Sequence, residues 1–175
     1  QFTDDMKKTI LTLLFVLLPF SFHSLAQQHL FQKISEMIDS VSIENLTEHI
    51  RILEDAGGHQ SRVTFTAGKD SALHYIYNYF KEHTNVTTLE LDTFYIPIAN
   101  PPYNTQPQVN VIATIEGSLN PSRYFVLGAH YDASASRMGT SIWNNQWSTI
   151  KAPGADDNAT GVAAIMEIAR VMTDS

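Results

Sequence analysis

Apolar residues at helical spacing predict three helices in the first half of the chain. The first covers Gln28 to Ile38, the second follows Ser42 and ends at Gly57-Gly58, and the third runs from Gly68 to about His83. In each helix the apolar positions recur every three or four residues, which places them on one face. Serine is a favoured N-cap and glycine a favoured terminator, so both ends of the second helix are marked. We expect the first two helices to form a plain N-terminal packing arm.

Three runs with strand character follow these helices. Val86 to Phe94 alternates between apolar and polar residues, Val109 to Ile115 forms a second run, and Tyr124 to Gly128 is almost entirely apolar. An apolar strand without alternation is typical of the centre of a sheet that is covered on both faces. Helices, strands and a further loop into a helix therefore predict an α/β sandwich. In such sheets ligands bind beyond the carboxyl ends of the strands, which is where the residues after Gly128 lie.

A fourth helical pattern occupies the last part of the sequence. Small residues at its start allow it to pack closely against a sheet. Its predicted apolar stripe consists of Val162, Ile165, Ile168, Ala169 and Met172.

Composition and charge narrow the chemistry that is available. The 175 residues carry a formal net charge of -7, and an acidic chain lacks the basic face that binding to nucleic-acid phosphates requires. The sequence has no cysteine, which excludes disulfides and thiolate metal sites. Any metal would therefore be held by His, Asp or Glu.

The start of the sequence predicts export. Residues 1–5 precede the first methionine and are interpreted as a non-native or upstream extension. Residues 6–26 have the basic start, apolar core and small-residue cleavage site of a signal peptide. A membrane anchor is the alternative, but the apolar run from Thr9 to Phe20 is short for a span. We expect a mature chain from residue 27 onward, without a stable membrane span, in the periplasm, on the cell surface or secreted.

Candidate chemistry begins after the third apolar run, in the sequence Gly-Ala-His-Tyr-Asp at residues 128–132. Alternate side chains of an extended chain share a face, so His130 and Asp132 should point the same way, with Tyr131 opposite. A carboxylate beside a ligating imidazole accepts its other ring proton and fixes the tautomer. His130 is therefore a candidate metal ligand and Asp132 a candidate orienting residue. The alternative is a polar strand exit without function.

A second acidic cluster precedes the last helix. Asp156, Asp157 and Asn158 follow a Pro-Gly turn, and a carboxylate at a helix N-terminus is stabilised as the anion by about 0.3–1 kcal/mol. An ionised carboxylate is the form that ligates a metal. An ordinary N-cap explains one of these residues, but not two adjacent acids.

Taken together, residues 128–132 and the stretch Ala-Pro-Gly-Ala-Asp-Asp-Asn-Ala-Thr-Gly at 152–161 closely resemble the zinc-dependent aminopeptidase family. This family contains di-zinc exopeptidases of the bacterial leucyl aminopeptidase and aminopeptidase Y type, with glutamate carboxypeptidase-like and glutaminyl cyclase-like members. The resemblance extends over Gln108 to Val171. It implies a three-layer α/β sandwich with a central mixed, mostly parallel sheet, of which residues 27–175 would be the N-terminal part of the catalytic domain.

The resemblance also implies roles for individual residues. His130 would ligate zinc, and Asp132 would be the catalytic aspartate that orients it. Asp157, directly before Asn158, would be the carboxylate shared by two zinc ions, with a cis peptide bond between the two residues. Asp156 would support the turn, although the sequence alone allows the two acids to exchange roles.

The function that the resemblance implies is that of an exported zinc exopeptidase, which removes N-terminal residues from peptides with a free N-terminus by means of a metal-activated water. The family's Glu-Glu pair, a further Asp and a final His lie downstream of the matching region. Residues 27–175 alone are therefore expected to be inactive, and Glu167 is not a substitute base. The alternatives are a glutaminyl cyclase-like acyltransferase with one zinc, or a non-catalytic homologue used for binding. The insert Ala133 to Lys151 either rims the substrate pocket or forms a surface loop.

Overall fold

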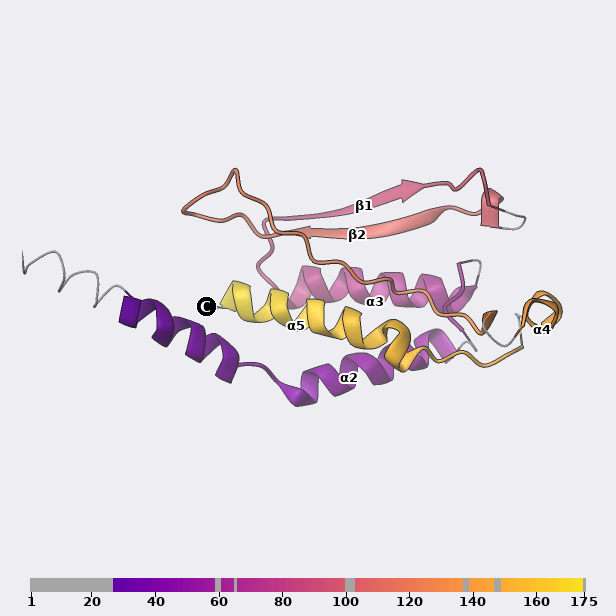
Figure 1. Ribbon diagram of the computed structural model, residues 1–175, viewed down its shortest axis with the longest axis horizontal. Helices are drawn as coiled ribbons and strands as arrows, with labels where there is room; N and C mark the ends of the chain where they lie inside the picture. Colours follow the sequence, from indigo (N-terminus) through magenta and orange to yellow (C-terminus); the bar gives the residue numbers. More distant parts are fainter. Residues whose placement is uncertain are drawn as a thin grey trace, which may run out of the picture. The chain divides into compact units, whose positions relative to one another are not determined.

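The computed structural model describes residues 27–174, apart from 59–60, 65, 100–102, 137–138 and 147–148 (Figure 1). The predicted extension and signal peptide, residues 1–26, lie outside the described residues. The chain divides into two compact units, Gln1–Ser40 and Val41–Ser175.

The described part of the first unit is a single helix. It covers residues 27–39, in agreement with the predicted helix. Ser40 follows it and donates a hydrogen bond from its Oγ to the Met37 carbonyl oxygen at 2.8 Å. Among the described helices, none combines the length and the apolar character that a membrane crossing needs.

Three helices carry the second unit. α2 (Ile43–Glu54) begins after Ser42, whose Oγ accepts a hydrogen bond from a main-chain N–H three residues later, as the predicted N-cap requires. α3 (Ala67–His83) begins in the same way after Thr66. α5 (Thr160–Asp174) is the last helix. All three agree with the predicted helices to within a few residues.

A shared apolar core joins these helices. α5 contacts both α2 and α3, and Figure 1 shows it between them. Large side chains from all three helices meet there, including Leu53, Ile76, Phe80, Val162 and Met166. Full burial of a side chain of this size contributes about 1.5–3 kcal/mol.

The buried face of α5 differs from the predicted stripe. Ile168 and Met172 are 40% and 48% exposed, whereas Met166 and Glu167 are buried. Several apolar faces fit the 3.6-residue period of this helix, so the spacing alone does not identify the face that the neighbouring helices cover. The contacts with α2 and α3 decide it.

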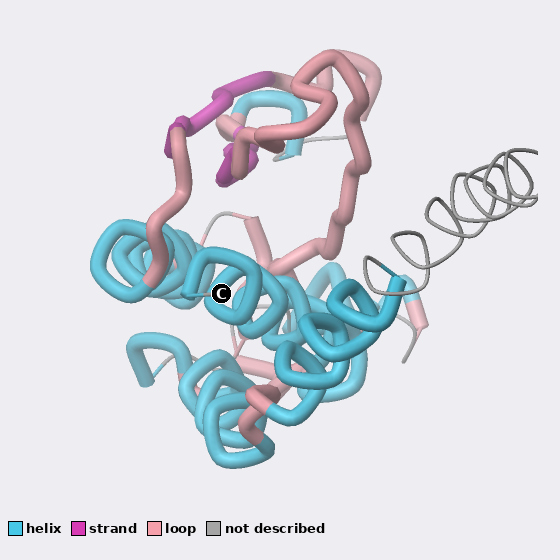
Figure 2. The backbone as a smooth tube through the Cα atoms, turned by 90° about the vertical axis from the view of Figure 1, so that its left-hand side faces the viewer, coloured by secondary structure: helices cyan, strands magenta, loops and turns pink. Residues whose placement is uncertain are grey.

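The described residues contain one sheet, which has two strands. β1 (Thr88–Phe94) pairs antiparallel with β2 (Gln108–Thr114), with Leu91 opposite Val111. Both strands contact α3, and Figure 2 shows the long helices of the second unit below the two strands. The first two predicted strands are confirmed, and the chain has the mixed helix and strand content of the predicted α/β class.

The third predicted strand is not formed. Residues 124–128 lack strand pairing, and the apolar side chains Tyr124, Phe125, Val126 and Leu127 are 80%, 81%, 91% and 60% exposed. A strand needs a neighbour to satisfy its main-chain N–H and C=O groups, and apolar composition alone does not supply one. The described residues therefore show a small antiparallel sheet in place of the expected three-layer sandwich with a mostly parallel sheet.

The insert Ala133 to Lys151 contains a short helix that the sequence pattern did not predict, α4 (Thr140–Gln146). A kinked turn, Ala155–Ala159, then leads directly into α5, and Asp157 and Asn158 within it have non-helical backbone angles. Because this turn contains both acids of the second cluster, the start of α5 sets their positions.

Candidate metal centre

Tyr131 anchors the segment that carries the first cluster. Its hydroxyl donates a hydrogen bond to the Val109 carbonyl oxygen in β2 at 2.8 Å. Burial, together with the negative charge of Asp132, raises the pKa of Tyr131 to about 12, so the hydroxyl keeps its proton. The chain is extended here, and His130 and Asp132 therefore project from the opposite side, as the alternation predicts.

The His130 ring lies between two carboxylates. Its Nδ1 is 3.1 Å from Oδ1 of Asp132, and its Nε2 is 3.0 Å from Oδ1 of Asp157. The three side chains are 53%, 52% and 64% exposed, respectively, so the group is open to solvent on one side. The structure thus brings together the three residues that the sequence singled out.

This arrangement has a definite chemical requirement. An ionised carboxylate only accepts hydrogen bonds, so each ring nitrogen of His130 needs a proton to face its carboxylate. A cation in place of the proton on Nε2 satisfies the same geometry. The proton would then stay on Nδ1, where it is hydrogen-bonded to Asp132. This hydrogen bond fixes the tautomer that leaves Nε2 free to bind the cation.

The turn before α5 places Asp157. Gly154 has a φ of 58° and a ψ of 40°, in the left-handed region that favours glycine. A Cβ on Gly154 would collide with the Cβ of Ala133 and would lie 2.8 Å from both Nη2 of Arg62 and the Asp157 carbonyl oxygen. Glycine is therefore required here for steric as well as conformational reasons.

The start of α5 separates the two adjacent acids. Asn158 caps the helix, since its Oδ1 accepts a hydrogen bond from the Gly161 N–H at 3.2 Å. The peptide bond between Asp157 and Asn158 is cis, as the family resemblance implied. Asp156 is exposed, and its carbonyl oxygen accepts from the Thr160 hydroxyl at 3.0 Å. Asp157, and not Asp156, therefore faces His130.

The donor set fits part of a zinc site. Two tetrahedral zinc ligands at about 2.0–2.2 Å from the ion lie about 3.4 Å apart, which is close to the 3.0 Å between Nε2 of His130 and Oδ1 of Asp157. In the part of the chain that the structure describes, no group of three or more His, Cys, Asp or Glu side chains could hold a metal ion. His130 and Asp157 would supply two of the three or four ligands that a zinc ion needs.

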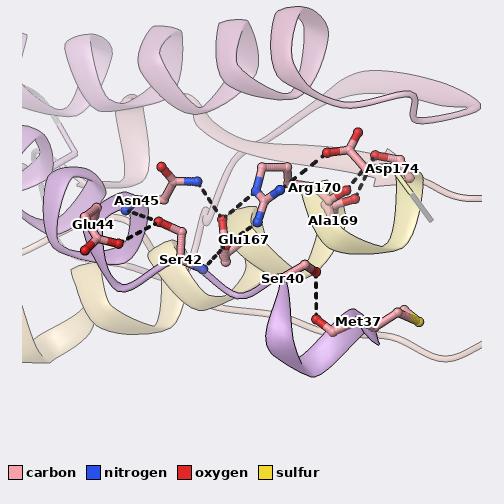
Figure 3. Close-up of polar contacts among 10 residues, drawn as sticks. Met37, Ser40, Ser42, Glu44, Asn45, Glu167, Ala169, Arg170 and Asp174 are labelled. Carbon is pink, nitrogen blue, oxygen red and sulfur yellow. Dashed lines mark hydrogen bonds and ion pairs between the residues drawn. The ribbon is translucent and has the colours of Figure 1, made fainter. Parts of the chain in front are cut away.

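Glu167 has a different role. Its carboxylate accepts hydrogen bonds from the Ser42 N–H at 2.7 Å, from Asn45 Nδ2 at 3.2 Å, and from both Nε and Nη2 of Arg170 (Figure 3). The bonds from Arg170, followed by those from Ser42 and Asn45, lower its pKa to about 2. This buried anion holds α5 against the start of α2 and is not available as a base.

Sequence reasoning missed one residue of the centre. The Arg62 side chain is buried, with 2% exposure. It donates hydrogen bonds to the main-chain carbonyl oxygens of Tyr131, next to His130, and of Pro153 and Gly154, which precede Asp157. A single arginine outside any motif gave no signal in the sequence.

The geometry describes an α/β chain in which an imidazole lies between two carboxylates, one facing each ring nitrogen. Residues 110–175 match Peptidase family M28. The predicted relationship to zinc-dependent peptidases is thereby confirmed.

Several proteins are similar to the chain over parts of their length. A "Probable zinc metalloprotease" of Pyrenophora teres f. teres (strain 0-1) is 34% identical over 143 residues, which cover 78% of this chain and 28% of the relative. A "Probable zinc metalloprotease" of Pyricularia oryzae is 45% identical over 62 residues, covering 35% and 11%. "Uncharacterized protein YfbL" of Escherichia coli (strain K12) is 36% identical over 77 residues, covering 44% and 20%. The chain thus spans less than a third of the length of each of these relatives.

Proposed function

We propose that the protein is a zinc-dependent peptidase that hydrolyses peptide bonds with a metal-activated water. The observation that carries this proposal is the placement of His130, with Nε2 3.0 Å from Asp157 and Nδ1 3.1 Å from Asp132. The match of residues 110–175 to Peptidase family M28 supports it, as do the fungal relatives described as probable zinc metalloproteases.

Each of the three residues has a distinct role in this proposal. His130 binds zinc through Nε2, and Asp132 holds the Nδ1 proton and keeps the ring in that orientation. Asp157 contributes Oδ1 beside Nε2, and its second oxygen allows the carboxylate to be shared between two ions. Bound zinc supplies an activated water and polarises the scissile carbonyl.

The proposed substrate is a peptide with a free N-terminus, from which the enzyme removes the first residue. The motif resemblance at residues 128–132 and 152–161 supports an exopeptidase of this kind. The signal-like sequence of residues 6–26 supports export to the periplasm, the cell surface or the medium.

The complete protein is proposed to have the three-layer sandwich with a mostly parallel sheet. Two features support this proposal. The exposed apolar run 124–127 is suited to a covered strand. A cavity of about 600 Å³ is lined both by β2 residues such as Val109 and Val111 and by Leu127, which leaves room for a further strand.

The test uses the complete protein and a set of amino-acyl-p-nitroanilides. Metal content is measured by mass spectrometry, and turnover is measured before chelation, after chelation and after zinc is restored. We expect bound zinc, loss of turnover with the chelator and recovery with zinc. A metal-free protein, or turnover that a chelator leaves unchanged, contradicts the proposal. Cyclisation of an N-terminal Gln peptide without anilide hydrolysis would instead indicate an acyltransferase.

A further inference from the structure

We propose that Arg62 is a positioning residue that fixes the separation of the two ligand-bearing segments; this inference rests on the proposed zinc site. Its Nε donates to the Tyr131 carbonyl oxygen at 2.7 Å, between His130 and Asp132. Its Nη2 donates to the Gly154 carbonyl oxygen at 3.0 Å, three residues before Asp157. One rigid side chain therefore links the His130 segment to the Asp157 turn.

Two more bonds fasten the guanidinium to its surroundings. Nη1 donates to the carbonyl oxygens of Leu53, at the end of α2, and of Pro153, each at 2.5 Å. The planar guanidinium carries five N–H groups in a fixed fork, so one side chain can hold four carbonyl oxygens in a set geometry. A lysine at position 62 has three donors on one atom and cannot reproduce this arrangement.

The segment that carries Arg62 is itself fixed at both ends. Ser61 pairs with Ala152 in a short parallel bridge, next to the Pro153-Gly154 turn. At the other end the Thr66 hydroxyl bonds to the carbonyl oxygens of Ser61 and Val63 while it caps α3. The guanidinium therefore acts from an anchored backbone.

The charge and the hydrogen bonds of Arg62 are compatible with the proposed zinc site. Burial lowers its pKa, and the negative charge of Asp132 partly offsets this effect. Arginine nevertheless remains charged in proteins. Its bonds within the described residues go to carbonyl oxygens, which leaves the carboxylates of Asp132 and Asp157 to His130 and to a metal.

A buried arginine with four bonds could also serve only to fill the core. The two roles differ in what a substitution changes. A core role predicts that Arg62→Lys lowers the stability of the metal-free protein and leaves its affinity for zinc unchanged. A positioning role predicts weaker zinc binding and an altered metal geometry, because the His130 and Asp157 segments lose their fixed separation.

The experiment compares the complete wild-type protein with Arg62→Lys and with the matched control Arg51→Lys, whose side chain is 71% exposed on α2. Zinc affinity is measured by competition with a chromophoric chelator, metal geometry by the absorption spectrum of the Co²⁺-substituted protein, and stability by urea unfolding of the metal-free form. For Arg62→Lys we expect zinc affinity to fall by about 10–100-fold and the cobalt spectrum to change. The control should match the wild type in both measurements.

The outcomes separate this inference from the proposed function. Wild-type protein that does not bind zinc overturns both. Wild-type protein that binds zinc, with Arg62→Lys equal to it in affinity and cobalt spectrum, overturns the role of Arg62 alone. If Arg62→Lys does not fold, a measurement on the wild-type protein tests the inference instead. In NMR spectra, the Nε–H resonance of Arg62 should shift when zinc is added in a stoichiometric amount. If zinc shifts none of the arginine Nε–H resonances, the inference is overturned.

Discussion

His130 is held from both sides by carboxylates that cannot donate a hydrogen bond to it. This arrangement distinguishes Asp132 and Asp157, which face the ring, from Asp156, which does not. Asp157 and Asp156 are adjacent in the sequence, but the turn before α5 directs only Asp157 toward Nε2 of His130. The specificity of the site therefore depends on the backbone of the turn as much as on the identity of the side chains.

The two adjacent acids give a matched test of this point. In the complete protein, Asp157→Asn should weaken zinc binding at least 100-fold and abolish chelator-sensitive turnover, because a neutral amide replaces an anionic ligand. Asp156→Asn makes the same chemical change one residue away, at an exposed side chain, and should keep wild-type affinity. Metal competition titrations measure both. Equal losses in the two variants would show that the acids are not distinguished as the structure places them.

Gly154 provides a steric test at the same scale. Gly154→Ala adds a Cβ that meets Ala133, Arg62 and the Asp157 carbonyl oxygen. We expect the free energy of unfolding to fall by about 1–3 kcal/mol and zinc binding to weaken with it. Gly117→Ala is the control, since a Cβ there meets no atom within 4 Å, and its effect should stay within about 0.5 kcal/mol. Urea unfolding measures both, and a neutral Gly154→Ala would contradict the close contact.

At the scale of elements, a buried carboxylate links α5 to the start of α2, in addition to the apolar core that the two helices share. Glu167 on α5 accepts hydrogen bonds from the main chain of Ser42 and the side chain of Asn45, at the start of α2, and pairs with Arg170. A helix N-terminus has unsatisfied N–H groups and a partial positive charge, and an anion is the natural partner for both.

The low pKa of Glu167 makes this contact sensitive to pH. The carboxyl has a pKa of about 2 in the folded protein and an ordinary value of 4.5. A depressed pKa stabilises the fold at pH values above 4.5, and this contribution is lost as the pH falls toward 2. We expect Glu167→Gln to lower the free energy of unfolding by about 3 kcal/mol near neutral pH, with a difference from wild type that shrinks steadily below pH 4.5.

Unfolding measured in urea across this pH range tests the contact, with Glu48→Gln as the control. Glu48 forms an exposed ion pair with Arg51 on α2, and such pairs contribute about 0–1 kcal/mol. A difference between Glu167→Gln and wild type that does not depend on pH would show that the carboxylate charge is not what joins α5 to α2.

Local signals in the sequence were sufficient for most elements. Ser42 marked the start of α2, and alternation marked β1, because caps and periodicity act within a few residues. The His130–Asp132 pair was also predictable, since it follows from the alternation of an extended chain. The positions of Arg62 and of the buried Glu167 were not predictable. Tyr131 and Gly154, which bond to Arg62, and Ser42 and Asn45, which bond to Glu167, lie far away in the sequence, and only the folded chain brings them together.

The third predicted strand shows the limit of local pattern at the same scale. Residues 124–128 have the composition of a buried strand, yet a strand exists only when a neighbour pairs with it. The difference between the predicted and the observed buried face of α5 has the same cause, since Ile168 and Met166 fit the helical period equally well. Which residues are covered depends on the other elements that are present.

At the scale of the whole molecule, two observations point in the same direction. The described residues bring together His130 and Asp157, the two proposed zinc ligands, without a third, and the apolar side chains 124–127 are 60–91% exposed. The chain also covers 28% of the length of the Pyrenophora relative. Both the incomplete ligand set and the uncovered apolar run are consistent with an activity that belongs to the complete protein.

Residues 27–175, produced alone, should therefore show no chelator-sensitive aminopeptidase activity, because two ligands do not hold zinc in a catalytic geometry. They should also bind an apolar fluorescent dye through the exposed run, which Val126→Thr should weaken. The complete protein should show turnover and little dye binding under the same conditions. Anilide hydrolysis by residues 27–175 that disappears with chelator would mean that His130, Asp132 and Asp157 suffice for catalysis. The requirement for further ligands would then be wrong, while the placement of these three residues would stand.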